Sequence, residues 1–222
     1  MDRETYNKIE AFMYHHMKDS AHDLLHIYRV LYQALIISKS YDEVNKDVLI
    51  TSCLLHDIGR QKQYSDNKIC HAIEGGKMAY EFLNNLGYDE QFCSHVMNCI
   101  VSHRFRTDSC PETLEAKILF DSDKLDVTGS LGIARSLMYI GLVGEPLYTV
   151  NENNDVQDGS DPNSPQSFFK EYHYKLSKLY DKFYTEEAAE ISQKRKRITE
   201  DFYEELVSEV DIGNLNKLLA LE

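Results

Sequence analysis

Apolar residues recur along most of this chain at steps of three and four, the spacing that gathers side chains on one face of an α-helix. Only 10 glycines and 4 prolines interrupt the pattern, so it predicts an almost wholly helical protein. The predicted helices are about 4–18, 20–36, 44–58, 71–86 and 89–103, then a long segment from Pro111 to about 140 with a break near Gly129, and finally about 167–184 and 186–209. Polar residues at 59–68 and turn-forming residues at about 141–166 predict two irregular loops.

The segment at about 44–58 is apolar on nearly all sides until it reaches His56 and Asp57. That pattern is typical of a buried central helix that ends at a polar site. A length of 222 residues fits one hydrophobic core. We therefore expect a single all-α domain over residues 1–222, with a helical core at about 20–140 and additional helices at about 167–221.

The charge of the chain narrows its partners. It carries 24 Lys and Arg against 37 Asp and Glu, a net charge of −13, so a long nucleic acid would be repelled. The basic residues 194–197 are flanked by acidic segments, which predicts a solvated helix face rather than a nucleic-acid site. A small phosphorylated ligand needs only a few local cations and remains compatible with this balance.

The chain lacks the roughly 20 consecutive apolar residues that a membrane-spanning helix needs, and it begins with a charged, amphipathic stretch rather than a secretory signal. We expect a cytoplasmic protein. Its five cysteines form no C-x-x-C pair, which favours free and mostly buried thiols over disulfides or a thiolate zinc site. Four tyrosines of the C-terminal helices look exposed and are compatible with a homo-oligomer; they are Tyr172, Tyr174, Tyr180 and Tyr184.

Candidate chemistry lies in segments that otherwise look buried, where polar side chains need partners. The residues are His26 in the second predicted helix, His56 and Asp57 at the end of the third, and Asp121, Asp123 and Asp126 within one turn of the 112–127 segment. Three carboxylates so close together repel one another unless solvent or a cation relieves them. One divalent ion held by His26, His56, Asp57 and one of the three aspartates would satisfy all of these segments. Two imidazoles and two carboxylates suit Mn²⁺, Fe²⁺, Co²⁺, Ni²⁺, Zn²⁺ or Mg²⁺, with water completing the coordination.

Three sequence elements carry a resemblance to a known family. AHDLLHIYRV (21–30), LLHDIGR (54–60) and ILFDSDKLD (118–126) resemble the ordered H…HD…D signature of the HD-domain metal-dependent phosphohydrolases. The resemblance extends over about residues 20–210. Within the family, the sequence is similar to a small bacterial branch that includes nucleotide pyrophosphohydrolases. It implies an all-α HD-type helical bundle.

The resemblance also implies a ligand set. The family's metal ligands fall on His26, His56, Asp57 and Asp123; Asp123 is selected because Lys124 and Leu125 follow it. His71 and His103 stand where some members hold a second metal, and here they would bind a second ion, contact phosphate, support the first site or have a purely structural role. Residues expected to orient the ligands from outside are His22, Arg29 and Asp121.

The implied reaction is metal-assisted hydrolysis of a phosphoester or phosphoanhydride, and the branch implies a nucleotide substrate, with manganese as the favoured ion. Asp57 or Asp126 would position or deprotonate water, and the candidate phosphate-binding cations are Arg60, Lys124, Arg29 and Arg104. Two alternatives stay open. One is a non-catalytic regulatory module that binds metal and nucleotide, and the other is a di-iron oxygenase, which would need both His71 and His103 as ligands.

Overall fold

The computed structural model describes residues 1–17, 24–104 and 110–210. Helices form nearly all of the regular structure in these residues, and one two-stranded hairpin is the exception, so the predicted all-α class is confirmed. The chain divides into two compact units, Met1–Asp126 and Val127–Glu222. The expectation of a single domain stays a prediction, and each unit is described by itself below.

The first unit holds seven helices among its described residues. They are α1 (Arg3–His16), α2 (Leu24–Ile37), α3 (Lys46–Leu55), α4 (Arg60–Ser65), α5 (His71–Asn85), α6 (Glu90–Ser102) and α7 (Leu114–Leu125), with a short 3₁₀ helix at Ser38–Ser40. Side chains cap several of them: Asn45 accepts hydrogen bonds from the first backbone N–H groups of α3, and Asp89 does the same for α6. The predicted helix boundaries in this unit hold to within a few residues.

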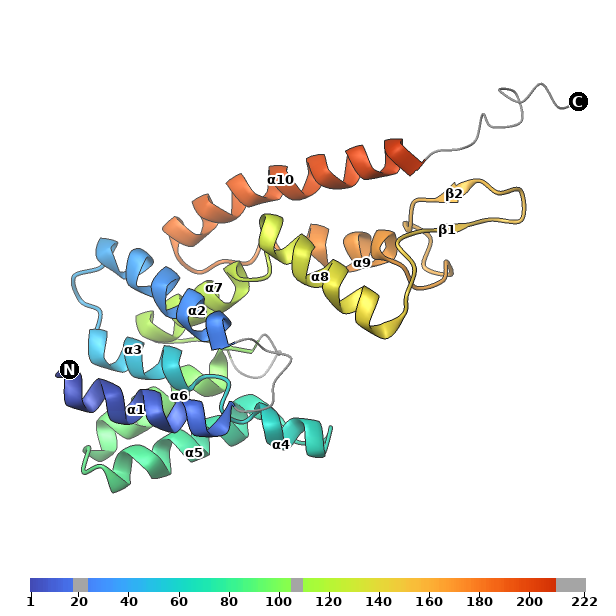
Figure 1. Ribbon diagram of the computed structural model, residues 1–222. Coiled ribbons are helices and arrows are strands. Elements are labelled where there is room, and N and C mark those ends of the chain that lie inside the picture. The colour runs from blue at the N-terminus through green and yellow to red at the C-terminus, as the bar shows by residue number, and fades with distance from the viewer. Residues whose placement is uncertain (18–23, 105–109, 211–222) are drawn as a thin grey trace, which may run out of the picture. The chain divides into compact units, whose positions relative to one another are not determined.

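The centre of the first unit is α3. It contacts α1, α2, α5, α6 and α7, and Figure 1 shows α1, α2 and α6 around it. All its residues from Val48 to Leu55 except Ile50 are buried, which confirms the predicted central helix. Because α3 is surrounded by other helices, the residues that follow its last turn, His56 and Asp57, lie in the interior of the unit.

One predicted loop of the first unit is wrong in part. Residues 59–68 were expected to be irregular, yet Arg60–Ser65 form α4. This helix buries none of its residues, so it lacks the apolar periodicity by which sequence analysis recognises a helix.

The second unit consists of α8 (Gly129–Val143), the antiparallel strands β1 (Thr149–Val150) and β2 (Val156–Gln157), α9 (Phe168–Tyr174), a 3₁₀ helix (Leu176–Lys178) and α10 (Glu186–Val210). The hairpin lies within the predicted irregular loop. The helix predicted over 167–184 is shorter than expected, because the backbone leaves the helical region at Lys175 (φ −132°). The C-terminal helices were predicted to reach residue 221, but residues 211–222 lie outside the described part of the chain.

Aromatic residues build the core of the second unit, and this corrects the expectation of four exposed tyrosines. The ring of Tyr172 stacks on Tyr203 with 3.7 Å between centroids, and Tyr180 is buried with its hydroxyl 2.6 Å from the Thr199 hydroxyl. Tyr174 and Tyr184 are exposed as predicted. The buried pair was misjudged because the sequence does not show that Tyr172 of α9 stacks on Tyr203 of α10, or that Tyr180, which follows the 3₁₀ helix, reaches Thr199.

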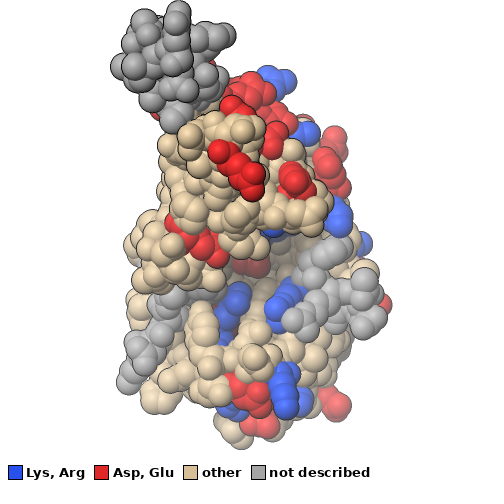
Figure 2. All heavy atoms as spheres, turned by 90° about the vertical axis from the view of Figure 1, so that its right-hand side faces the viewer, with Lys and Arg blue, Asp and Glu red and all other residues tan. Residues whose placement is uncertain are grey.

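The surface and the thiols agree with the sequence interpretation. The five cysteines are free, and Cys53, Cys93 and Cys99 are buried. Lys194, Lys196 and Arg197 line a groove on α10 together with acidic residues of the same helix. Basic side chains also lie among acidic ones over the face shown in Figure 2.

Among the described residues, none of the helices has both the length and the apolar character that crossing a membrane requires.

Candidate metal centre

Six histidine and aspartate side chains meet inside the first unit, around the end of α3. They are His26 from α2, His56 and Asp57 from the turn after α3, His71 from the first residue of α5, His103 from the residue after α6, and Asp123 from α7. The elements that supply them are far apart in sequence but contact one another in pairs, α2 with α3 and α7, and α6 with α3 and α5. They form two clusters, one on each side of Asp57.

The first cluster consists of His26, His56 and Asp123. The Nε2 atoms of the two histidines are 3.3 Å apart, and the Oδ1 atom of Asp123 lies 3.2 Å from Nε2 of His26 and 3.8 Å from Nε2 of His56. The Oδ2 atom of Asp57 lies 3.8 Å from each of the same two nitrogens. The structure thus brings together the four residues that the sequence resemblance assigns to one ion.

The second cluster consists of Asp57, His71 and His103. Oδ1 of Asp57 lies 3.5 Å from Nε2 of His71 and 3.6 Å from Nε2 of His103, and these two nitrogens are 3.3 Å apart. One carboxylate therefore presents one oxygen to each cluster. The sequence had suggested Asp57 as a ligand of one ion, and the structure places it between two sets of ligands.

The protein atoms fit a divalent cation. Asp57 is completely buried, and its Oδ2 atom has no hydrogen-bond partner among the described residues. An unpaired carboxylate oxygen in the interior is costly, and a cation relieves that cost directly. Imidazole nitrogens and carboxylate oxygens in this combination are ligands for the borderline divalent metals, from Mn²⁺ to Zn²⁺.

The far side of each histidine ring is held by a hydrogen-bond acceptor. The Nδ1 atoms lie near Asp126 Oδ2 (2.8 Å, His26), the Cys53 carbonyl (2.8 Å, His56), Gln63 Oε1 (2.6 Å, His71) and the Ile100 carbonyl (2.5 Å, His103). Because these groups accept, Nδ1 is the donor and Nε2 is the ring nitrogen that is left to bind a cation. Sequence reasoning missed Gln63, which belongs to the unpredicted helix α4, and it had no means of finding the two backbone carbonyls.

Asp126, which sequence reasoning left as a supporting or a substrate-side residue, lies behind the ring of His26. Its carboxylate receives Arg29 Nε at 2.7 Å and Arg29 Nη2 at 3.0 Å while it accepts from His26 Nδ1. Arg29 therefore contacts the first cluster through Asp126, and its expected supporting role stays a prediction. A carboxylate whose two oxygens are both engaged in this way is placed to orient His26.

The other predicted site residues are less directly connected to the clusters. Lys124 lies over the Phe120 ring at 5.6 Å, Asp121 is completely buried, and Arg104 Nη1 is 3.9 Å from the sulfur of Cys70. Arg60 is the exception, because its Nε donates to Asp57 Oδ1 at 2.9 Å. His22 lies outside the described residues.

The pKa values of the clustered residues differ with their surroundings. Burial lowers the pKa of His56 to about 4, and burial together with the charge of Arg60 lowers the pKa of His71 to about 3, so both imidazoles are neutral at pH 7. Burial also lowers the pKa of His26, but its bonds to Asp123 and Asp126 outweigh this and raise the value to about 9, so a bound cation would have to displace its Nε2 proton. Burial raises the pKa of Asp57, yet His56, His103 and Arg60 hold it well below its usual range.

We expect Asp126→Asn to weaken metal binding about 10- to 100-fold without unfolding the protein, because the asparagine no longer fixes the His26 tautomer with a charged acceptor. Titration of metal-free protein with Mn²⁺ measures the effect. Asp42→Asn, which alters an exposed carboxylate, is the matched control and should leave the affinity unchanged. Equal affinities in the two variants would show that Asp126 does not orient a ligand.

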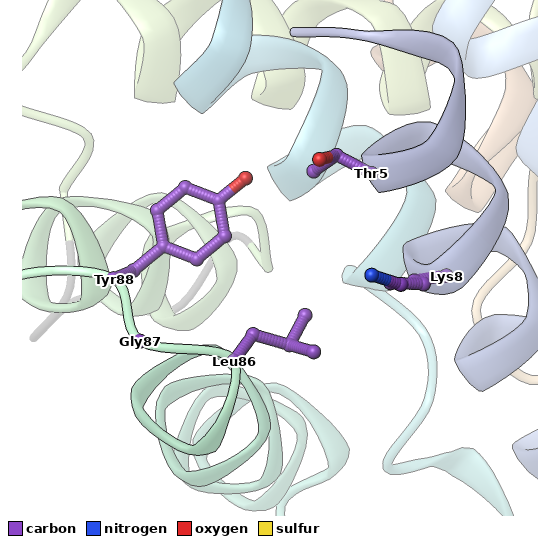
Figure 3. Close-up of a pocket in the computed structure, with 5 residues that line it drawn as sticks. All are labelled: Thr5, Lys8, Leu86, Gly87 and Tyr88. Atoms are coloured by element: carbon purple, nitrogen blue, oxygen red, sulfur yellow. The ribbon is translucent and has the colours of Figure 1, made fainter.

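A separate pocket of about 270 Å³ lies between α1 and the turn that follows α5. Figure 3 shows its five lining residues, none of which is a histidine, cysteine, aspartate or glutamate: Thr5, Lys8, Leu86, Gly87 and Tyr88. None of them belongs to either cluster, so this pocket does not compete with the buried clusters as the centre for metal chemistry.

Comparisons with known proteins show what this chain is similar to. The sequence model of the HD domain matches residues 24–128, a span that contains all six clustered residues. The uncharacterised protein YpgQ of Bacillus subtilis is 25% identical over 198 residues, which are 87% of this chain and 86% of YpgQ. The crystal structure of YpgQ in complex with ADP superposes with a TM-score of 0.69 and covers 92% of this chain and 97% of YpgQ. A crystal structure of an HD-superfamily hydrolase from Bacillus thuringiensis, 28% identical, covers 93% of this chain and 97% of its own with a TM-score of 0.71.

Proposed function

Because the chain belongs to the HD superfamily and has its hydrolase fold, we propose that it is a divalent-metal-dependent phosphohydrolase whose substrate is a nucleotide. The observation that carries the proposal is the buried Oδ2 atom of Asp57, which has no hydrogen-bond partner among the described residues and lies 3.8 Å from the Nε2 atoms of both His26 and His56. The ADP in the YpgQ crystal structure supports the nucleotide part.

The residues assigned to the ion are His26, His56, Asp57 and Asp123. A bound divalent ion lowers the pKa of water and neutralises charge on phosphate oxygens, and manganese is our favoured choice. Asp123 is the ligand nearest to solvent, since its side chain is 25% exposed whereas the other three are buried. A substrate phosphate would therefore approach from the side of Asp123.

The remaining residues act around this centre. Asp126 holds His26 in place through its engaged carboxylate, and Asp57 is the better candidate for positioning water because its Oδ2 atom is directed into the cluster. Arg60 and Lys124 would supply positive charge toward the phosphate. With a net charge of −13, the chain favours a small phosphorylated substrate over long nucleic acid.

The second cluster favours one other function. Two imidazoles and a carboxylate oxygen beside the first cluster would allow a pair of irons, as in the di-iron oxygenases of the HD fold. That function requires two iron ions per chain, so elemental analysis distinguishes it from hydrolysis.

The other alternative, a regulatory module, would bind metal and nucleotide but release no product.

We expect metal-free protein to release phosphate or pyrophosphate from at least one nucleoside mono-, di- or triphosphate when Mn²⁺, Co²⁺, Ni²⁺, Zn²⁺ or Mg²⁺ is restored. Product analysis by chromatography identifies the bond that is cleaved. His56→Ala should reduce the reaction to background, because it removes a buried ligand. His15→Ala changes an exposed histidine of α1 and should retain full activity.

Two results would contradict the proposal. Full activity of His56→Ala would show that the first cluster is not the site of hydrolysis. Binding of nucleotide and metal with no product across the panel would favour the regulatory module.

A further inference from the structure

The two clusters are unequal because of one arginine. Arg60 begins α4, three residues after Asp57, and its Nε donates to Oδ1 of Asp57 at 2.9 Å. This is the oxygen that faces the second cluster, whereas Oδ2, which faces the first, has no hydrogen-bond partner in the described residues. The arginine thus occupies one side of the shared carboxylate and leaves the other side available.

The charges around the two clusters also favour a cation in the first cluster over one in the second. The first cluster has a second carboxylate, Asp123, with an oxygen 3.2 Å from Nε2 of His26. In the second cluster, Asp57 is the only carboxylate among the described residues that group there. The guanidinium of Arg60 has its charge next to this single anionic ligand, and a divalent cation bound at the same oxygen would be repelled by it.

The outer partners strengthen the difference. The ring of His26 is backed by the carboxylate of Asp126, which makes its Nε2 a better donor to a cation, whereas His71 is backed by the neutral amide of Gln63.

We infer that Arg60 restricts this protein to one tightly bound divalent ion, held in the first cluster, by placing its positive charge on the Asp57 oxygen that a second ion would need. The inference rests on the proposed metal-dependent function and specifies its metal stoichiometry. His71 and His103 then serve as hydrogen-bonding groups beside a one-ion centre, and the cation that neighbours them is an arginine of the chain itself.

The test is the number of Mn²⁺ ions that each chain holds, measured by equilibrium dialysis and elemental analysis without nucleotide. We expect one ion for the wild-type protein and two for Arg60→Met, with the second ion bound about 10- to 100-fold more tightly than in the wild type. The electron paramagnetic resonance spectrum of Arg60→Met should show two coupled Mn²⁺ ions. Arg60→Lys retains the positive charge and should retain the single ion.

Two further variants locate the effect. Lys62→Met removes a cation from the same helix, but Lys62 pairs with Glu74 and not with Asp57, so it should hold one ion like the wild type. Adding His71→Ala to Arg60→Met should abolish the second ion and spare the first. If Arg60→Met proves too unstable to purify, Arg60→Gln removes the charge while it keeps a hydrogen-bond donor, and the same gain is expected.

The inference is overturned if the wild-type protein already binds two ions of similar affinity, or if Arg60→Met and Arg60→Gln bind one ion no differently from the wild type. These outcomes are separate from failure of the proposed function. A chain that hydrolyses no phosphorylated compound would still show the change in stoichiometry, and a chain that hydrolyses nucleotides with two ions would refute only the role of Arg60.

Discussion

Replacement of Asp57 by asparagine is expected to abolish turnover and to weaken metal binding by at least about 100-fold, the largest effect of any single change in the site. Asp57 is the one residue whose two oxygens face the two clusters. An asparagine has almost the same shape but no charge, and its NH₂ group would be directed at one cluster or at Arg60. Elemental analysis and product release measure the two losses.

The matched control for this variant is Asp47→Asn in the first turn of the same helix, α3. Asp47 is half-exposed and pairs with the amino terminus at 2.6 Å, so its replacement should cost at most about 1 kcal/mol and leave metal binding intact. Circular dichroism would show that Asp57→Asn is folded. If this folded variant kept its metal, Asp57 could not be a ligand.

The sequence allowed the position of the site in the fold to be anticipated, because a helix that is apolar on nearly all sides is buried, and the two polar residues at its end are then buried with it. The choice among three aspartates was harder. Asp123 and Asp126 are three residues apart and share a helix face, so both reach His26, one at Nε2 and the other at Nδ1. Residue spacing alone cannot tell which of the two ring nitrogens a carboxylate meets, and it was the family resemblance that singled out Asp123.

Other features depend on contacts that leave no trace in local sequence. Helix α4 has no buried face, so the supporting role of Gln63 could not be predicted from periodicity. The division of Asp57 between two clusters depends on the orientation of one carboxylate in the turn after α3, and on the places where α5 and α6 begin and end. Such arrangements are set by long-range packing, which a single sequence does not reveal.

We expect Gly59→Ala to destabilise the protein by about 3 kcal/mol and to weaken metal binding, because this turn has no room for a side chain. A Cβ atom on Gly59 would overlap the carbonyl oxygen of His71 and lie 2.7 Å from the backbone nitrogen of Gly75. Both neighbours are backbone atoms of α5, so the clash cannot be relieved by rotating a side chain. It would push the first turn of α5, and His71 with it, away from Asp57.

The control for Gly59→Ala is the same substitution at Gly141 in α8, where an added Cβ would meet no atom within 4 Å. Alanine is the better helix former, so Gly141→Ala should raise the free energy of unfolding by about 1 kcal/mol. Urea denaturation compares the two variants, and Mn²⁺ titration follows the site. If Gly59→Ala were as stable as the wild type, the close approach of α5 to the turn after α3 would not be what holds the clusters together. If it were destabilised but bound Mn²⁺ normally, the turn would support the fold without positioning the ligands.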